Sequence, residues 1–279
     1  MESTFQKIRV LYEEMGPGEK KIADYLVKHA PEVISLSVTE LAGRSGVGEA
    51  TAVRFSRRLG FAGFQALKVQ LAREVGANST LPGEIEKGDS GYEIFRKRCA
   101  DISVALQNTQ EVLSPEAMEE AVQRIMAARR IAIFGLGNSA SIASDAAHKF
   151  LRLGLDAISC SDNHMQAIIA SHLTRDCVAI GISHSGSSRD VVEALEYSKL
   201  GGAFTIAITN YGSSPLVKKA DLTLFTKSEE TRHSILGMSS RIAALAICDA
   251  IYTAIAVRAE KSAVQAIYNT EAALQNKKY

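Results

Sequence analysis

The stretch Val178-Ala-Ile-Gly-Ile-Ser-His-Ser-Gly-Ser-Ser-Arg-Asp190 decides the fold of the C-terminal half. It opens with an apolar run (178–182), turns through four serines and a glycine, and ends in polar residues that can begin a helix. Four similar apolar runs lie in this half, at 131–134, 157–160, 205–208 and 222–225. Each is four or five residues long without polar alternation, which is typical of parallel strands buried on both faces. The sequence therefore predicts an α/β fold with a doubly wound, five-stranded parallel sheet.

Polar loops follow the first and third of these runs. The first is Gly135-Leu-Gly137-Asn138-Ser139-Ala140, and the third carries the serines of 183–188. Ligands of open parallel sheets bind at the carboxyl ends of the strands, where glycines, hydroxyls and helix N-termini suit a phosphate group. Because there is no P-loop lysine, a nucleoside triphosphate is not expected. The two loops predict a phosphate site, although capped serine turns would look alike, and the first loop also fits the dinucleotide pattern G-x-G-x-x-A.

Residues 37–60 predict a helix-turn-helix. Ser37 and Glu40 have the spacing of a capping box, Gly46 suits the turn, and a second helix opens near Glu49. Across 41–75 there are six basic and two acidic residues, an excess that an ordinary helical hairpin would not need. This excess favours DNA binding over the hairpin alternative. The predicted DNA-binding residues are Ser37, Thr39, Arg44, Glu49, Ala50, Thr51, Arg54, Arg57, Arg58 and Lys68.

Composition limits the remaining classes of protein. The 279 residues carry 32 Lys+Arg and 31 Asp+Glu, so any basic surface must be local. The four cysteines have neither disulfide-framework nor zinc-ligand spacing, and no metal or other cofactor is expected. The N-terminus lacks a signal-peptide core, and no uninterrupted apolar stretch of about 18 residues is present. These features predict a cytoplasmic protein that does not associate with membranes.

The chain is expected to divide into a helix-turn-helix domain at 1–76, a Gly/Ser/Pro-rich linker at 77–91, and an α/β domain at 92–279 with its core at about 125–260. Two helices are expected between 92 and 128, the second started by Ser114 and Pro115. The Ala-rich segments 238–258 and 262–275 are expected to be oligomerisation helices.

At this point the residues resemble a known family. S-V-T-E-L-A at 37–42, A-T-A-V-R-F at 50–55 and L-G-F-A-G-F-Q-A-L-K at 59–68 resemble the helix-turn-helix domain of RpiR-family bacterial transcriptional regulators. G-L-G-N-S, S-H-S-G-S-S and S-S-R-I-A-A-L-A-I-C-D resemble the sugar isomerase (SIS) domain that these regulators carry. Gly48 departs from the family, which usually has a capping serine there.

The resemblance implies which residues meet a ligand. Ser139, Ser183, Ser185 and Ser188 would hold the phosphate of a phosphosugar, and Gly137 and Gly186 would allow its approach. Glu230 would meet the sugar hydroxyls, with Glu229 as the alternative, and His164 is a weaker candidate. The complete predicted ligand set is Gly137, Asn138, Ser139, Ser183, His184, Ser185, Gly186, Ser187, Ser188 and Glu230.

The function expected from the resemblance is a regulator of carbohydrate metabolism genes, controlled by a phosphosugar and without catalytic activity. Its partners would be an operator with an inverted repeat and further copies of the chain, as a homodimer or homotetramer. A sugar-phosphate aldose–ketose isomerase is the alternative, since Glu230 and a histidine could supply the acid and base. An NAD(P)-binding regulator is a third interpretation, based only on G-L-G-N-S-A.

Overall fold

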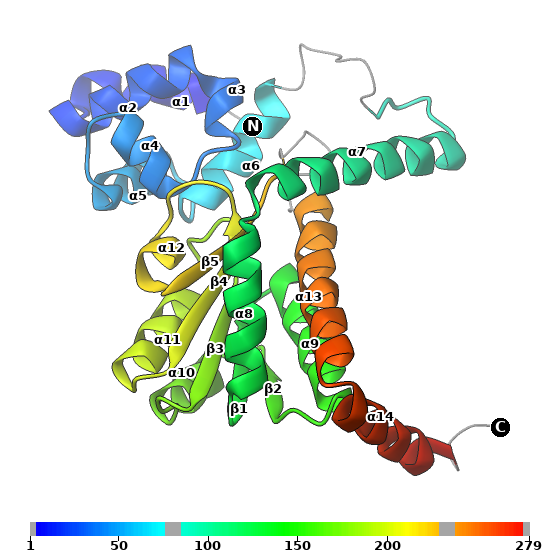
Figure 1. The fold of residues 1–279 in the computed structure, drawn as a ribbon. Coiled ribbons are helices and arrows are strands. Elements are labelled where there is room, and N and C mark those ends of the chain that lie inside the picture. Colours follow the sequence, from blue (N-terminus) through cyan, green and yellow to red (C-terminus); the bar gives the residue numbers. More distant parts are fainter. Residues whose placement is uncertain (1–3, 76–84, 229–237, 276–279) are drawn as a thin grey trace. The chain divides into compact units, whose positions relative to one another are not determined.

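The computed structural model describes residues 4–75, 85–228 and 238–275. The chain separates into two compact units, whose main boundary falls at Ser103 and Val104, and the later segment Gly212–Ser214 is grouped with the first unit. Both residues lie within the long helix α7 (Gly91–Val112). The N-terminal unit is helical, and the C-terminal unit contains the sheet (Figure 1).

The N-terminal unit consists of short helices around one apolar core. Its elements are α1 (Thr4–Leu11), η1 (Tyr12–Glu14), α2 (Pro17–Lys28), α3 (Ala30–Val33), α4 (Val38–Arg44), α5 (Glu49–Arg58) and α6 (Phe64–Val75). Ile22, Leu26, Leu41, Phe55 and Leu67 are fully buried and belong to one cluster. The core is thus shared by α2, α4, α5 and α6, which holds the helix-turn-helix pair in a small domain.

The predicted helix-turn-helix is confirmed in its local details. The Ser37 side chain accepts a hydrogen bond from the Glu40 N–H, and the Glu40 carboxylate accepts one from the Ser37 N–H. Gly46 turns the chain with a φ of 63°, in the left-handed region that glycine adopts without strain. Gly48 begins α5 without a side-chain cap, as expected for a residue with no side chain.

The C-terminal unit is built on a five-stranded sheet in which every pair of neighbouring strands is parallel. The strands are β1 (Arg130–Gly135), β2 (Ala157–Cys160), β3 (Cys177–Ile182), β4 (Phe204–Asn210) and β5 (Leu222–Thr226), in the order β2-β1-β3-β4-β5. All five predicted strands are confirmed. Only the three inner strands are buried almost throughout, because β2 and β5 form the edges.

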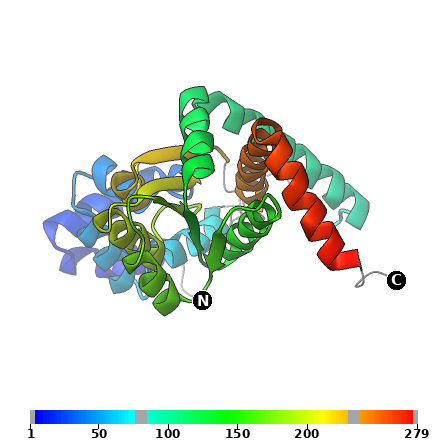
Figure 2. The same cartoon turned by 60° about the horizontal axis from the view of Figure 1, so that its bottom comes forward.

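Helices cover both faces of this sheet (Figures 1 and 2). One face packs against α8 (Pro115–Ala127), α9 (Asn138–Arg152), α13 (Met238–Arg258) and α14 (Glu260–Leu274), and the other against α10 (Asn163–Ser171), α11 (Arg189–Leu200) and α12 (Pro215–Lys219). The first face presents mainly isoleucines, such as Ile133 and Ile180, whereas the second presents small residues, such as Ala179. A Cβ at Gly181 would lie 2.9 Å from Leu195 Cδ1, so α11 packs closely on the sheet.

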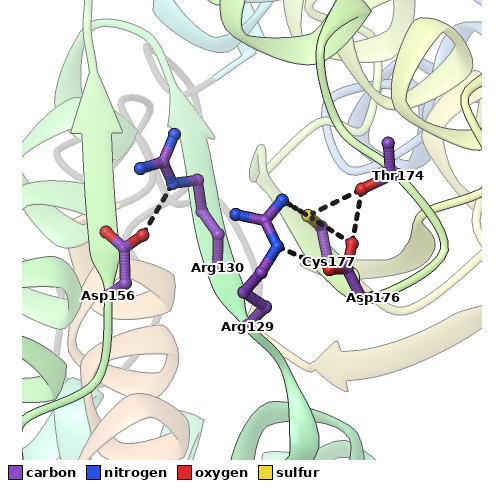
Figure 3. Close-up of polar contacts among 6 residues, drawn as sticks. All are labelled: Arg129, Arg130, Asp156, Thr174, Asp176 and Cys177. Carbon is purple, nitrogen blue, oxygen red and sulfur yellow. Dashed lines mark hydrogen bonds and ion pairs between the residues drawn. The ribbon is translucent and has the colours of Figure 1, made fainter.

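Ion pairs join three neighbouring strands at their amino ends. Figure 3 shows Arg129 bonded to Asp176, and Arg130 donating from Nε to Asp156 Oδ2 at 2.8 Å. Asp176 also accepts from the Thr174 hydroxyl, and this bond and the Arg129 guanidinium hold the pKa of Asp176 well below its usual range. These pairs lie at the end of the sheet opposite the predicted ligand loops.

The two helices expected to mediate oligomerisation are present as α13 and α14. Ile247, Ile251 and Ile255 of α13 lie in the core against the sheet, while Ala246 and Ala250 are exposed. By length and composition α13 could cross a membrane, with 39% of its most apolar window buried. Its core contacts make it a packing helix of the α/β unit. Oligomerisation through α13 and α14 stays a prediction.

Candidate functional site

The strand order itself locates a ligand site. From β1 the chain moves to β2 on one side, and then crosses to β3 on the other side of β1. Such a reversal between neighbouring parallel strands is a topological switch point, where the connecting loops diverge and leave a crevice at the carboxyl ends. The two predicted loops follow β1 and β3, and therefore flank the switch point.

The loop after β1 is folded tightly over the strand end. A Cβ at Gly135 would lie 2.6 Å from the Ser139 carbonyl oxygen, so only glycine fits there. Gly137 has a φ of 55° and precedes α9, which begins at Asn138. Asn138 is exposed and Ser139 half-buried. The N-terminus of this 15-residue helix opens at the switch point, where the helix dipole favours an anion. The N–H groups of Ser139 and Ala140 donate to the carbonyls of Leu136 and Gly137 at 3.0 and 3.1 Å.

The loop after β3 brings serine hydroxyls together. Ser183 is buried and its Oγ lies 3.1 Å from Ser188 Oγ. Gly186 turns the chain with a φ of 60°, and the Ser187 N–H donates to Ser185 Oγ at 3.3 Å. Although Ser188 occupies the N-cap position of α11, its side chain makes no capping bond. Its hydroxyl is instead beside Ser183, which favours a ligand role over the capped-turn alternative.

His184 belongs to the same loop and is fixed through its backbone. Its carbonyl oxygen accepts from the Asn210 N–H at 3.1 Å and from Thr209 Oγ1 at 3.4 Å. The β3 loop is thereby fastened to the end of β4. His164, the weaker candidate, is exposed on α10. Glu229 and Glu230 lie outside the described residues, so their role in binding stays a prediction.

Gln166 is a residue that the sequence analysis missed. It is fully buried on α10, and its Nε2 donates to the Gly135 carbonyl at 3.1 Å and the Cys160 carbonyl at 2.7 Å. It therefore ties the carboxyl ends of β1 and β2 together beneath the first loop. The available signal was its spacing of four from Ala170, which places a polar residue on the buried face of the helix.

A dinucleotide site would need an acidic residue near the end of β2 to bind the ribose, and Asp162 at that position is used locally. Its carboxylate accepts from the Met165 N–H at 2.8 Å as the N-cap of α10. With this carboxylate in a capping role, the NAD(P)-binding interpretation still rests only on the G-L-G-N-S-A loop.

The predicted DNA-binding residues gather mainly on α5. Ala50, Arg54 and Arg57 are exposed, and Thr51 is half-buried. The Thr39 hydroxyl donates to Glu49 Oε1 at 2.9 Å, which joins α4 to the start of α5. The exposed side of α5 can therefore enter a DNA groove while its apolar side is held in the core.

Other predicted DNA contacts are engaged within the domain. Arg44 is paired with Glu32 at 3.1 Å and remains exposed. Arg58 donates to Glu19 Oε2 at 3.0 Å and to the Glu14 carbonyl at 2.7 Å, so its charge is largely balanced.

Lys68 requires a correction. It is only 3% exposed, and its ammonium donates to the Leu36 carbonyl at 3.1 Å, since α6 packs its side chain inward. A buried ammonium cannot meet a DNA phosphate, so Lys68 is a structural residue of this domain. It does not belong to the DNA interface that we propose below.

A candidate anion site at the switch point of a parallel sheet, in a chain that also carries a helix-turn-helix unit, is typical of one class of protein. Proteins of this class join a DNA-binding module to a sugar-isomerase-type domain. Comparison with known proteins agrees: the profile of the rpiR-family helix-turn-helix domain matches residues 3–78, and that of the SIS domain matches residues 124–254. The chain belongs to the RpiR family of helix-turn-helix transcriptional regulators.

Two relatives and one solved structure are similar to this chain. An uncharacterized HTH-type transcriptional regulator of Caldanaerobacter subterraneus is 35% identical over 272 residues, covering 97% of this chain and 96% of the relative. The bifunctional protein glk of Paraburkholderia xenovorans is 33% identical, covering 92% of this chain but 40% of the longer relative. The structure of Vibrio vulnificus NanR, solved with ManNAc-6P, has a TM-score of 0.83, 22% identity and 99% coverage of both chains.

These comparisons confirm the fold and the main functional expectation, a transcriptional regulator. The domain boundaries at 76 and 91 stay predictions.

Proposed function

We propose that this protein regulates carbohydrate metabolism genes in the bacterial cytoplasm, and that a phosphosugar bound at the switch point controls its affinity for DNA. The observation that carries the proposal is the pairing of Ser183 and Ser188 at the start of α11, beside the glycine loop that opens α9. Two helix N-termini and several hydroxyl groups lie at the carboxyl ends of the neighbouring strands β1 and β3. This arrangement suits a dianionic phosphate. The ligand of Vibrio vulnificus NanR, ManNAc-6P, belongs to this chemical class.

The roles within the site follow from the loops. Ser139, Ser183, Ser185 and Ser188 would donate to the phosphate oxygens, and Gly186 would let the backbone approach. Asn138, Ser187 and His184 would line the same crevice, and Glu230 would accept from the sugar hydroxyls. Because hydroxyls and N–H groups are neutral, this site recognises the phosphate by hydrogen bonds more than by net charge.

On the DNA side, α5 would enter the major groove. Arg54, near the start of the helix, would reach base edges with Thr51, Ala50 and Glu49, whereas Arg57 would contact phosphates. Two heads in a homodimer would read an inverted repeat with half-sites spaced by whole helical turns. A coupling of about 1–3 kcal/mol between effector and DNA would change the affinity for the operator roughly 5- to 150-fold.

The effector half of the proposal is tested by thermal shift and calorimetry with a panel of hexose and pentose phosphates, with NAD(H) included. We expect one phosphosugar to stabilise the protein. Ser183→Ala should weaken its binding roughly 10- to 150-fold, because a hydrogen bond to a charged group contributes about 1.5–3 kcal/mol. Ser171→Ala, at an exposed serine on α10, is the matched control. Stabilisation by NAD alone would refute the phosphosugar site, and conversion of the bound sugar would establish the isomerase alternative.

The DNA half is tested by measuring affinity for operator and random duplex at several salt concentrations. Arg57→Ala should weaken both complexes and flatten the salt dependence, whereas Arg54→Ala should mainly reduce the preference for operator. Lys68→Met supplies a contrast, since this buried lysine should alter stability without changing the salt slope. Equal losses on both duplexes for the two arginine variants would contradict the division of roles.

A further inference from the structure

The N-terminal unit has an open groove that the helix-turn-helix does not use. It lies between α1 and α2 and measures about 500 Å³. Its lining residues are Phe5, Ile8, Arg9, Tyr12, Glu13, Asp24, Val27 and Lys28. Val27 is 54% exposed, although it is a valine on a helix whose other apolar residues are largely buried. A single exposed apolar side chain is ordinary on a protein surface, so a partner is indicated here by the charges around the groove.

The charges around this groove are separated into two ends. The Tyr12 hydroxyl donates to Asp24 Oδ1 at 2.7 Å, so the end of α1 lies beside the middle of α2. Glu13 lies next to this contact, and its side chain is 91% exposed and paired with Lys20 at 3.6 Å. This end therefore carries two carboxylates and one ammonium group. From this acidic end, α1 runs back to Arg9 and α2 runs forward to Lys28. Each lies four residues away, which is about 6 Å along a helix.

The opposite end of the groove is therefore basic. Arg9 and Lys28 are both exposed, and the structure pairs neither with a carboxylate among the described residues. Between the two ends lie Val27 and the ring of Tyr12. The groove thus has an acidic end, an apolar middle and a basic end, all on one small surface.

Such a pattern is complementary to itself. A two-fold axis through the apolar middle would place the basic end of one groove against the acidic end of the other. It would also bring Val27 near its counterpart and remove it from water. We propose that this groove is the surface through which the DNA-binding heads of two copies pair. Another protein helix would need the same separation of charges, whereas a second copy of this chain already carries it.

The inference rests on the proposed homodimer. Pairing through so small a surface would be weak between separate molecules. Heads tethered within one dimer meet at a far higher effective concentration, of the order of mM for short flexible linkers, which makes a weak contact sufficient. Head pairing would then set the spacing of the two recognition helices before DNA binds.

Cysteine cross-linking of the full chain tests the contact without DNA. In a Cys99→Ser background, which removes the exposed native thiol, Val27→Cys should form a covalent dimer with a short bismaleimide. Gln65→Cys, exposed on α6, is the matched control and should cross-link at least about tenfold more slowly. Equal rates at the two positions would overturn the proposal.

Charge reversal tests the pairing pattern. Arg9→Glu with Lys28→Glu, added to Val27→Cys, makes both ends acidic and should lower cross-linking about tenfold, because like charges then meet. Co-expression with a copy carrying Glu13→Lys and Asp24→Lys should restore a mixed dimer. Unchanged cross-linking of the acidic variant would refute the proposal, and circular dichroism would verify that each variant keeps its helices.

Light scattering and operator binding separate this inference from the proposed function. A full chain that is dimeric and binds operator, but does not cross-link at Val27→Cys, would refute only the groove contact. A full chain that is monomeric and binds no DNA would refute both.

Discussion

Replacing Gln166 tests whether the link between β1 and β2 supports the ligand end of the sheet. In Gln166→Leu, a side chain of similar size remains, but the carbonyls of Gly135 and Cys160 lose their donor. Leaving two buried carbonyl oxygens without a donor lowers the free energy of unfolding by about 1–3 kcal/mol each. Gln166 Oε1 has no hydrogen-bond partner among the described residues, so its removal raises the free energy of unfolding by about 1–2 kcal/mol. The net loss is then about 0–5 kcal/mol, and we expect a central value of about 2.5 kcal/mol.

Thermal unfolding followed by circular dichroism measures this loss. For a domain of this size each kcal/mol lowers Tm by about 2–4 °C, so at the central value Gln166→Leu should unfold roughly 5–10 °C below the unmodified protein. Gln166→Glu should unfold lower still, because its carboxylate would face two carbonyl oxygens. The control is Gln123→Leu, at an exposed glutamine on α8, which should change stability by less than about 0.5 kcal/mol. If Gln166→Leu had the same Tm as this control, the two hydrogen bonds would not stabilise the protein as proposed.

Three further perturbations have defined outcomes. Gly48→Ser should raise stability by about 0.5–1 kcal/mol in urea unfolding, because a Cβ there meets nothing within 4 Å and serine adds a cap to α5. Gly181→Val should lower Tm by several degrees, since even a Cβ would lie 2.9 Å from a leucine methyl of α11, and an unchanged Tm would refute this packing. Asp176→Asn should destabilise at neutral pH. Thr174 and Arg129 lower the pKa of Asp176 in the folded protein, so its ionised carboxylate stabilises the fold above the pKa that it has in the unfolded chain. This stabilisation is lost in acid. The difference in stability between Asp176→Asn and the unmodified protein should therefore shrink as pH falls below about 4.

The sequence predicted the sheet well because its strands are short and continuously apolar. Glycine and serine follow both β1 and β3, so these two strands and their loops could be located from residue type alone. The N-terminal capping box at Ser37 and Glu40 was equally local, involving residues three apart. Local patterns of this kind are predictable from sequence because their hydrogen bonds form within one helical turn.

Long-range contacts were beyond this reasoning. Lys68 appeared as a surface charge, but its position on α6 turns it toward Leu36, which lies 32 residues earlier. Gln166 appeared unremarkable within α10, yet it binds the ends of two strands. Arg9 and Glu13 likewise form the two ends of a groove only because α1 packs beside α2. Each case depends on which helix face packs inward, and composition alone does not specify it.

The unequal faces of the sheet have a consequence for how the protein can vary over evolutionary time. On the isoleucine face, exchanges among valine, leucine and isoleucine change volume slightly and leave room for compensation in α9 and α13. On the opposite face the residues are small, among them Ala179, Gly181 and Ala207. A Cβ at Gly181 would lie 2.9 Å from Leu195 Cδ1, so a larger side chain there would displace α11. Since α11 starts at the serine loop, such a displacement reaches the ligand end directly. In a saturation library selected for effector response, this narrow face should retain its residues while the opposite face drifts.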